Sequence, residues 1–338
     1  ACGYGCPFGR KQSTMITYLQ DASEKGARML VGCDVRRVTM ANGAVTGIEG
    51  WAADSETGER RSVTVRAPRV IVAGGAVESP ALLLRSGLRN PNIGQHLRLH
   101  PVAVVAGQYA EPIHAWEGSL QTVYSRQFAN LTGNYGIWFE VAPAHPGLLS
   151  LATPWDGGQA FKTEMLRAPH LAAMIVLARD TGEGSVTLDR YGDPVLDYFP
   201  NTTDQRHLIR GMRELVKVAM AGGAVGATTL HSPTLRFEAD NLKPGGYTEK
   251  RLSAHLDEIT ARGLRPNAPM LFSAHQMGTA RMGGSAKTAV TDPYGKVWGV
   301  RGLYVGDGSL LPTAPGVNPM LSIYGAAYRV GQAILAEG

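Results

Sequence analysis

The sequence predicts an α/β protein with a second region built on a mixed sheet. Glycine accounts for 42 of the 338 residues, against about 7% in an average protein. This excess is typical of tight turns and close backbone approaches. The short apolar run 69–73 ends in Gly74 and Gly75 and is followed by a helical stretch. Strand, glycine turn and helix in this order resemble a phosphate-binding turn, although the G-x-G-x-x-G pattern is absent, and the glycine content suits a nucleotide-binding α/β protein.

Composition excludes several other classes of protein. Hydrophobic residues make up 44% and charged residues 18%, so the chain can bury a core and is not a disordered tail. The net charge of +5 comes without a dense Lys/Arg run, and aromatic residues are only 7%. We therefore expect no nucleic-acid partner.

Three cysteines are too few for a disulfide framework and favour a reducing compartment. Cys2 and Cys6 lie four residues apart without a nearby histidine, which is too few ligands for a closed zinc site, so we expect no metal. The uncharged stretch 218–230 is too short to cross a bilayer, and the first residues contain no apolar signal core. We expect a cytoplasmic protein.

The first region combines a helix, a meander of strands and the glycine turn. Helical spacing of apolar residues predicts a helix over 13–24. Strand-like runs follow, separated by turn residues at 42–43 and 56–58. After the apolar strand 69–73, Ser79 and Pro80 predict the start of a helix, with proline at its first position. The strand-like runs cover 29–40, 44–53 and 62–67.

The remainder divides into a less regular middle and a regular end. Strand-like runs and an amphipathic helix over about 203–221 predict a mixed sheet with a helix on it. Near the end, the strand 302–305 leads into the loop 306–309, and a helix begins at Asn318 and Pro319. The strand-like runs of the middle region are 102–106, 135–141, 171–178 and 185–188.

Two features are candidates for chemistry. A helix N-terminus such as that at Asn318 stabilises an anion when it faces a cleft, although the motif alone favours a plain capped helix. His275 lies among small residues and glycines that let a bulky ligand approach the backbone, although a structural histidine is the alternative. The chain contains no P-loop, no G-x-S-x-G and no H-E-x-x-H pair.

Taken together, four segments resemble the glucose–methanol–choline (GMC) oxidoreductases. Residues 75–88 are similar to the second signature of that family, and 93–101 to the segment that follows it. His275-Gln276-Met277-Gly278-Thr279 resembles its active-site H-x-x-G-T, and 302–319 its C-terminal flavin-binding element. The opening 5–14 and the phrase 275–283 most resemble the long-chain alcohol oxidase branch.

The resemblance implies FAD as cofactor and the oxidation of an alcohol to a carbonyl by hydride transfer to flavin N5. The substrate would be a small-molecule alcohol, apolar and long-chained. His275 would accept the hydroxyl proton and Asn318 would hold the alcohol oxygen. The residues that the resemblance places at the cofactor are Val35, Gly74, Gly75, Asp307, Gly308, Asn318, Pro319 and Met320.

The resemblance also implies a division of the chain. Residues 1–96 and 267–338 would be parts of a Rossmann-like FAD-binding domain, and 97–266 the substrate domain. The strand and glycine-rich turn with which the family begins are missing here, so we expect a missing N-terminal segment or a second chain to supply them. The alternatives are a sugar, polyol or sterol dehydrogenase subunit, or an inactive fragment.

Two further residues have open roles. Glu140, in the run 138–141, is either a carboxylate on the substrate side or a solvated strand residue. His100, next to Pro101, is expected to be structural.

Overall fold

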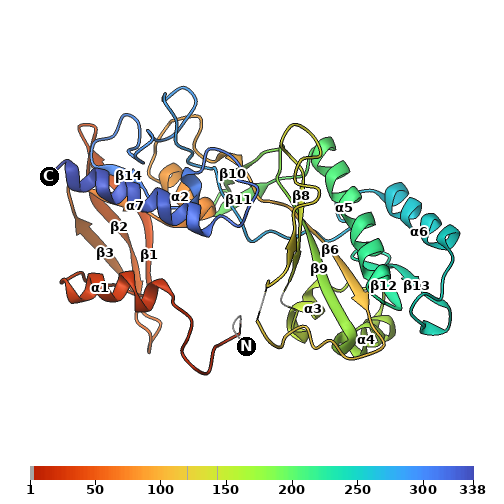
Figure 1. Ribbon diagram of the computed structural model, residues 1–338. Helices are drawn as coiled ribbons and strands as arrows, with labels where there is room; N and C mark the ends of the chain where they lie inside the picture. The colour runs from red at the N-terminus through yellow and green to blue at the C-terminus, as the bar shows by residue number, and fades with distance from the viewer. Residues whose placement is uncertain (1–3, 120, 143) are drawn as a thin grey trace. The chain divides into compact units, whose positions relative to one another are not determined.

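The computed structural model describes residues 4–119, 121–142 and 144–338, and this part of the chain divides into two compact units (Figure 1). We name the two units by their place along the sequence. The central unit contains the described residues of 1–11, 100–182 and 200–274. The flanking unit contains residues 12–99, 183–199 and 275–338. Cys2, considered above as a metal ligand, lies outside the described residues.

The central unit is built on an antiparallel sheet. Among the described residues its strand order is β13-β12-β6-β9-β8-β7, and every neighbouring pair is antiparallel. The predicted strands at 102–106, 135–141 and 171–178 are confirmed. The strands are β6 (Val102–Gln108), β7 (Tyr124–Ser125), β8 (Ile137–Val141), β9 (Leu171–Ala178), β12 (Gly226–Thr229) and β13 (Leu235–Glu238).

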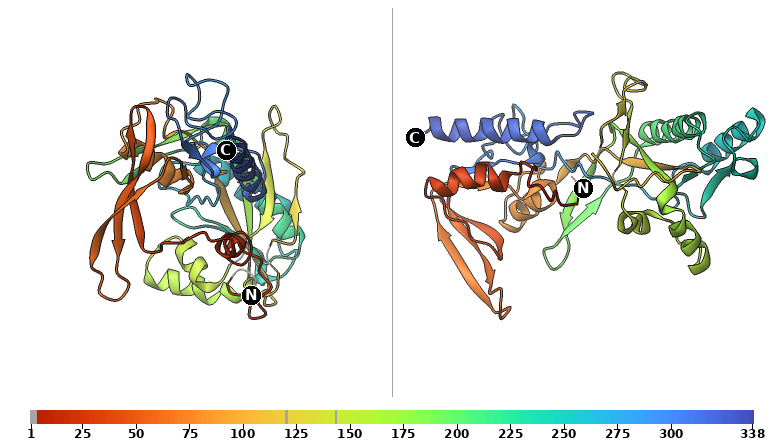
Figure 2. Two further views of the ribbon diagram at one scale, coloured as in Figure 1. Left: turned by 90° about the vertical axis from the view of Figure 1, so that its left-hand side faces the viewer. Right: turned by 60° about the horizontal axis from the view of Figure 1, so that its bottom comes forward.

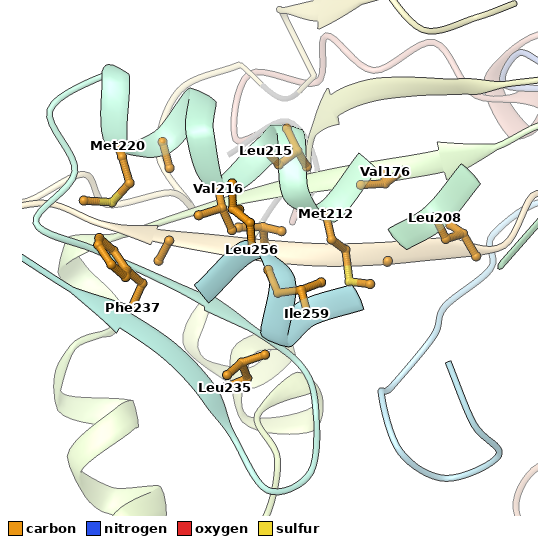
Figure 3. Packing of buried hydrophobic residues seen from close by; sticks show 14 of the residues in the cluster. Val176, Leu208, Met212, Leu215, Val216, Met220, Leu235, Phe237, Leu256 and Ile259 are labelled. Carbon is orange, nitrogen blue, oxygen red and sulfur yellow. The ribbon is translucent and has the colours of Figure 1, made fainter. Parts of the chain in front are cut away.

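Helix α5 (Thr202–Ala221) covers one face of this sheet, which confirms the predicted amphipathic helix. The helix begins where the side chain of Asn201 accepts hydrogen bonds from the backbone N–H groups of Thr203 and Asp204. Its apolar face packs on the sheet and on α6 (Glu249–Arg262), as Figure 3 shows. The buried cluster includes Val176, Leu208, Met212, Leu215, Val216, Phe237, Leu256 and Ile259.

The shorter helices of the central unit connect its strands. They are α3 (Pro146–Ala152), α4 (Gly158–Leu166) and the 3-10 turns η2 (Ala168–His170) and η3 (Asp240–Leu242).

The flanking unit contains a long antiparallel sheet, β1-β2-β3 among its described strands, which Figure 2 shows in both views. Its strands are β1 (Cys33–Ala41), β2 (Ala44–Ala53) and β3 (Arg60–Arg66). The helix predicted over 13–24 is interrupted: a 3-10 turn η1 (Thr14–Ile16) is separated from α1 (Tyr18–Glu24) by Thr17, whose φ of −130° and ψ of −101° are not helical. Neither piece has a buried residue.

A parallel pair of strands forms the centre of the flanking unit. In β4 (Val70–Val72) and β14 (Leu303–Val305), Val70 lies opposite Leu303 and Val72 opposite Val305. Helix α2 (Gly75–Arg85) and helix α7 (Met320–Ala336) pack against this pair through a buried cluster that includes Leu83 and Val330. Because the strands are parallel, the loops that follow them lie at the same end of the pair.

Residues 183–199 belong to the flanking unit, whereas the sequence analysis placed them in the middle region. The strand β10 (Gly184–Leu188) pairs with β5 (Gln95–Leu97) and with β11 (Pro194–Asp197), not with the sheet of the central unit. The pairing partner of β10 lies about ninety residues earlier in the chain, and the alternation of residues does not reveal such a partner.

Two predicted helix starts need correction. Helix α2 begins at Gly75 rather than at Ser79, so Pro80 lies inside the helix and not at its first position. Helix α7 begins at Met320, and the cap position is Pro319 rather than Asn318. Pro319 already has a helical φ of −85°, and its carbonyl accepts the N–H of Ile323, so the difference is one residue. Among the described helices, none is both long and apolar enough to span a bilayer.

Candidate functional site

Asp307 ties together the two loops that follow the parallel strands. Its buried carboxylate accepts hydrogen bonds from the N–H of Gly75 (2.8 Å) and the N–H of Ser309 (2.8 Å). The hydroxyls of Ser79 and Ser309 donate to the same carboxylate. Four donors fill the acceptor sites of one carboxylate, so the Asp307 side chain acts as the anchor of this turn. Contacts from this loop to a ligand would therefore come from its backbone.

Gly74 and Gly75 form the start of α2 in this anchored turn. The N–H of Gly74 donates to the Ser79 hydroxyl at 2.9 Å, and Gly75 has a φ of +79°. The structure thus brings three of the predicted cofactor residues, Gly74, Gly75 and Asp307, to one place.

Thr279 fastens the segment of His275 onto α2. Pro80 has no N–H, so the carbonyl of Ala76 lacks its usual donor from four residues later. The hydroxyl of Thr279 donates to that carbonyl at 2.7 Å, and both residues are buried. Pro80 therefore leaves the Ala76 carbonyl without a helical donor, and Thr279, from another sequence motif, supplies one.

The residues on either side of β5 also form hydrogen bonds with the His275 segment. Arg98 and Met277 exchange backbone hydrogen bonds of 2.9 and 3.0 Å, and the N–H of Gly94 donates to the Thr279 carbonyl at 2.8 Å. Gly278 has a φ of +90°, and a Cβ placed there would lie 2.4 Å from the carbonyl oxygen of His96. Glycine is therefore required at position 278, three residues from His275.

Gly308 connects the His275 segment to the first turn of α7. A Cβ added at Gly308 would lie 3.1 Å from Cδ1 of Ile323 and 3.2 Å from the carbonyl oxygen of Gln276. Its own carbonyl accepts the N–H of Gly278 at 3.3 Å. The neighbour of His275 and the start of the helix that follows Asn318 thus meet at this residue.

The predicted residues near the start of α7 differ in exposure. Asn318 is half-buried, Pro319 is buried and Met320 is exposed. Asn318 precedes the first helical turn, whose N–H groups carry the positive end of the helix dipole. The helix contributes Val330 to the core, whereas Leu321, Tyr324 and Tyr328 are exposed.

His275 itself is half-buried, and its burial lowers the pKa of the imidazole below the ordinary value. Desolvation disfavours the charged form. The imidazole is therefore neutral near pH 7 and able to accept a proton.

Val35 and Gly74 line one cleft of the flanking unit. The cleft has a volume of about 540 Å³, and residues of β4 form part of its wall together with residues of β1 and α2. Glu78 and Arg85, 3.4 Å apart, stand on its α2 side. A volume of this size is typical of a small-molecule site.

Glu140 and His100 lie in the central unit. Glu140 is only 6% exposed and accepts a hydrogen bond from the Gln121 amide at 3.2 Å, so it is not a solvated strand residue. His100 is fully buried, and its backbone N–H donates to the Asp180 carboxylate at 3.2 Å. Within the described ranges, no group of three His, Cys, Asp or Glu residues has the arrangement of a metal site.

Sequence reasoning missed four residues that organise this site: Ser79, His96, Glu183 and Thr279. Ser79 was interpreted as the start of a helix and Thr279 only as part of the H-x-x-G-T motif, although a hydroxyl after a glycine turn is a signal for such a hydrogen bond. His96 and Glu183 carry no local signal, because they meet across 87 residues of chain.

Models of the GMC oxidoreductase family match residues 1–102 and 180–327. Two long-chain-alcohol oxidases of Arabidopsis thaliana are 31% and 33% identical over 99% of this chain. The chain spans about half the length of these curated relatives, 45% and 46%. The crystal structure of pyridoxine 4-oxidase from "Mesorbium loti" superposes with a TM-score of 0.64 at 19% identity, over 90% of this chain and 58% of that one.

Proposed function

Because this chain belongs to the GMC oxidoreductase family, we propose that it is part of an FAD-dependent enzyme that oxidises an alcohol to a carbonyl compound. The central unit would bind the substrate, and the flanking unit would hold part of the flavin. One observation carries this proposal: Gly308 packs closely against both the Gln276 carbonyl and the Ile323 side chain. It joins the His275 segment to the helix start after Asn318, at the end of the parallel pair where α/β sheets bind ligands.

The residues present fit an FAD molecule. The cleft beside Val35 and Gly74, about 540 Å³ in volume, has room for an adenine ring. The glycine turn at 74–75 and the loop at 307–308 offer backbone atoms for the ribityl and phosphate part. The positive end of the α7 dipole, with the Met320 N–H, suits the electron-rich edge of an isoalloxazine ring.

FAD, when bound, supplies the acceptor for the carbinol hydride. His275, neutral because it is half-buried, accepts the hydroxyl proton of the alcohol. The Asn318 amide donates a hydrogen bond to the alcohol oxygen and stabilises the negative charge that develops there without adding a charge of its own. The two residues thus divide proton removal and oxygen binding between them.

A long-chain alcohol is the proposed substrate. The similarity to two long-chain-alcohol oxidases over 99% of the chain supports this choice. The sheet face of the central unit opposite α5 is also apolar: it carries a buried cluster of Val102, Ile175 and Leu177.

We also propose that a further flavin-binding segment, on the same polypeptide or on a second chain, pairs with β4. Within the described part of the chain, β4 has β14 as its only strand neighbour, and Ile71 is 52% exposed. Parallel strands are normally buried between neighbours on both sides. An added strand beside β4 would cover this edge and complete the turn that holds the pyrophosphate.

The test is a substrate series measured on the flavin-loaded protein that contains this chain. Primary alcohols from butanol to hexadecanol are compared with glucose, sorbitol and cholesterol. The proposal predicts that kcat/KM rises with chain length, by up to about fourfold per methylene, since each buried methylene contributes about 0.8 kcal/mol. A preference for the sugars or the sterol would overturn the long-chain assignment. Loss of all activity despite bound flavin would overturn the alcohol oxidation itself.

A further inference from the structure

An ion cluster is formed by His96 on β5, Arg98 just after β5, and Glu183 just before β10. One oxygen of Glu183, Oε2, lies 2.9 Å from Nδ1 of His96 and 3.3 Å from an Nη of Arg98. The side chains of His96 and Arg98 are 19% and 14% exposed, whereas that of Glu183 is 46% exposed, so the two pairs are partly shielded from water on the β5 side. Solvent weakens such pairs, but one carboxylate here contacts two basic side chains at once.

Two residues of this cluster, His96 on β5 and Arg98 just after it, contact the His275 segment through their backbone. Arg98 exchanges both backbone hydrogen bonds with Met277. The carbonyl of His96 rests against Gly278, where a Cβ would come within 2.4 Å of it. A displacement of either residue would therefore move the backbone two to three residues from His275.

The backbone of His96 is itself strained. Its φ of +65° lies in the left-handed region, which a residue other than glycine adopts only where its surroundings compensate for the strain. The contact with Glu183 is such a restraint. This conformation directs the His96 carbonyl toward Gly278.

Glu183 remains ionised in this environment. Burial raises the pKa of its carboxyl, but the hydrogen bond with His96 and the charges of His96, Arg98 and Arg281 outweigh this and hold the pKa below its usual range. The Glu183 carboxylate is therefore charged throughout the neutral pH range, so the cluster keeps its negative charge there.

We propose that Glu183 is a positioning residue: by holding His96 and Arg98, it fixes the backbone of 277–278 and thereby the place and shielding of His275. This inference rests on the proposed function of His275 as proton acceptor. Glu183 touches neither substrate nor flavin in this role, and it acts only through β5.

The test reads the position of His275 without flavin or substrate. The full 338-residue chain is labelled at histidine, and the imidazole titrations are followed by NMR, with the His275 signal assigned from its loss in His275→Gln. In Glu183→Gln, the His275 pKa should rise toward about 6.5, because water reaches the ring. His96→Asn should give the same rise, since asparagine tolerates the left-handed backbone but lacks the imidazole.

The control is Glu49→Gln, which breaks the 2.6 Å pair with Arg37 on the β1–β2 sheet of the same unit. This variant should leave the His275 titration unchanged. In the flavin-loaded protein, Glu183→Gln should lower kcat by about 10- to 100-fold with little change in KM, and Glu183→Asp should recover part of the loss.

A His275 titration that is identical in wild type, Glu183→Gln and His96→Asn overturns the proposal. Should Glu183→Gln fail to fold, His96→Asn alone decides between the two results. Normal turnover in His275→Ala would instead contradict the proposed function. The NMR titration would still show whether Glu183 positions the ring.

Discussion

At the scale of single residues, the site depends on side chains that satisfy backbone groups. The Asp307 carboxylate accepts hydrogen bonds from both loops at the end of the parallel pair. The Thr279 hydroxyl donates to the Ala76 carbonyl, to which Pro80 has no N–H to donate. These bonds are buried, so the loss of one partner leaves an unpaired polar group away from water. Small motif residues therefore carry stability as well as chemistry.

Thr279→Val tests this directly. The substitution keeps the shape of the side chain but removes the hydroxyl, so the buried Ala76 carbonyl loses its donor. We expect a loss of about 1–3 kcal/mol in the free energy of unfolding, measured by urea denaturation. Thr279→Ser retains the hydroxyl and should retain most of the stability. Equal stability of Thr279→Val and wild type would show that the bond is unimportant.

The sequence could indicate these residues but not their partners. The motif around Thr279 was visible, and so was Pro80, yet Pro80 was placed at a helix start because proline favours that position. In the structure the helix begins five residues earlier, and Thr279 compensates for the missing N–H. A hydrogen bond between residues 203 positions apart leaves no local pattern.

At the scale of elements, close packing decides where helices can approach strands. Helix α5 comes so near β9 that a Cβ at Gly211 would lie 2.2 Å from Cγ1 of Val176 and 2.8 Å from Cδ1 of Ile137. These residues belong to the main core of the central unit. The glycine is thus a packing requirement inside an otherwise good helix.

Gly211→Ala should therefore destabilise the protein, although alanine is the better helix former by about 1 kcal/mol. Overpacking of a rigid core costs about 1–3 kcal/mol, and thermal unfolding should show a lower Tm. The matched control is Gly325→Ala in α7, where a Cβ meets no atom within 4 Å and stability should stay equal or rise. A higher Tm for Gly211→Ala would contradict the packing described here.

Elements with strong local patterns were predictable, and their pairing was not. The runs of β6, β8 and β9 and the helix α5 were all visible in the sequence. The strand β10 was visible too, but the alternation of its side chains does not indicate which sheet it joins. It pairs with β5 in the flanking unit. The break at Thr17 was also hidden, because the helical spacing of 13–24 continues across it.

At the scale of the whole molecule, buried histidines contribute to the response to acid. Burial lowers the pKa of His207, His231 and His255 in the central unit and of His275 in the flanking unit. The buried rings are neutral in the folded chain, whereas in the unfolded chain each takes up a proton near pH 6.5. Protonation therefore favours unfolding as the pH falls.

The stability that these rings contribute is complete above about pH 6.5 and is lost as the pH drops below that value. Each histidine can contribute up to about 1.4 kcal/mol per pH unit until its folded-state pKa is reached. We expect Tm to fall between pH 6.5 and 5 and to be flat above pH 7. His255→Leu should make the fall shallower, while His114→Gln, at a side chain that is 43% exposed, should leave it unchanged. An unchanged slope in His255→Leu would contradict this account.

The family was recognisable from the sequence because its motifs are local and lie in order along the chain. The site residues around His275 come from four segments, at 74–79, 94–98, 275–282 and 306–310, which the structure joins by hydrogen bonds. The order of these segments could be read from the sequence. Their geometry depends on contacts such as that of Gly278 with His96, which only the folded chain contains.

The central claim is that His275 accepts the hydroxyl proton of an alcohol while FAD is bound. The most direct measurement is the rate of flavin bleaching after anaerobic mixing with a long-chain alcohol, in the flavin-loaded protein and in His275→Ala. We predict that the substitution slows bleaching by about 10²–10⁴-fold and leaves the FAD content unchanged. A rate within about threefold of wild type would contradict the claim, and so would loss of flavin together with activity.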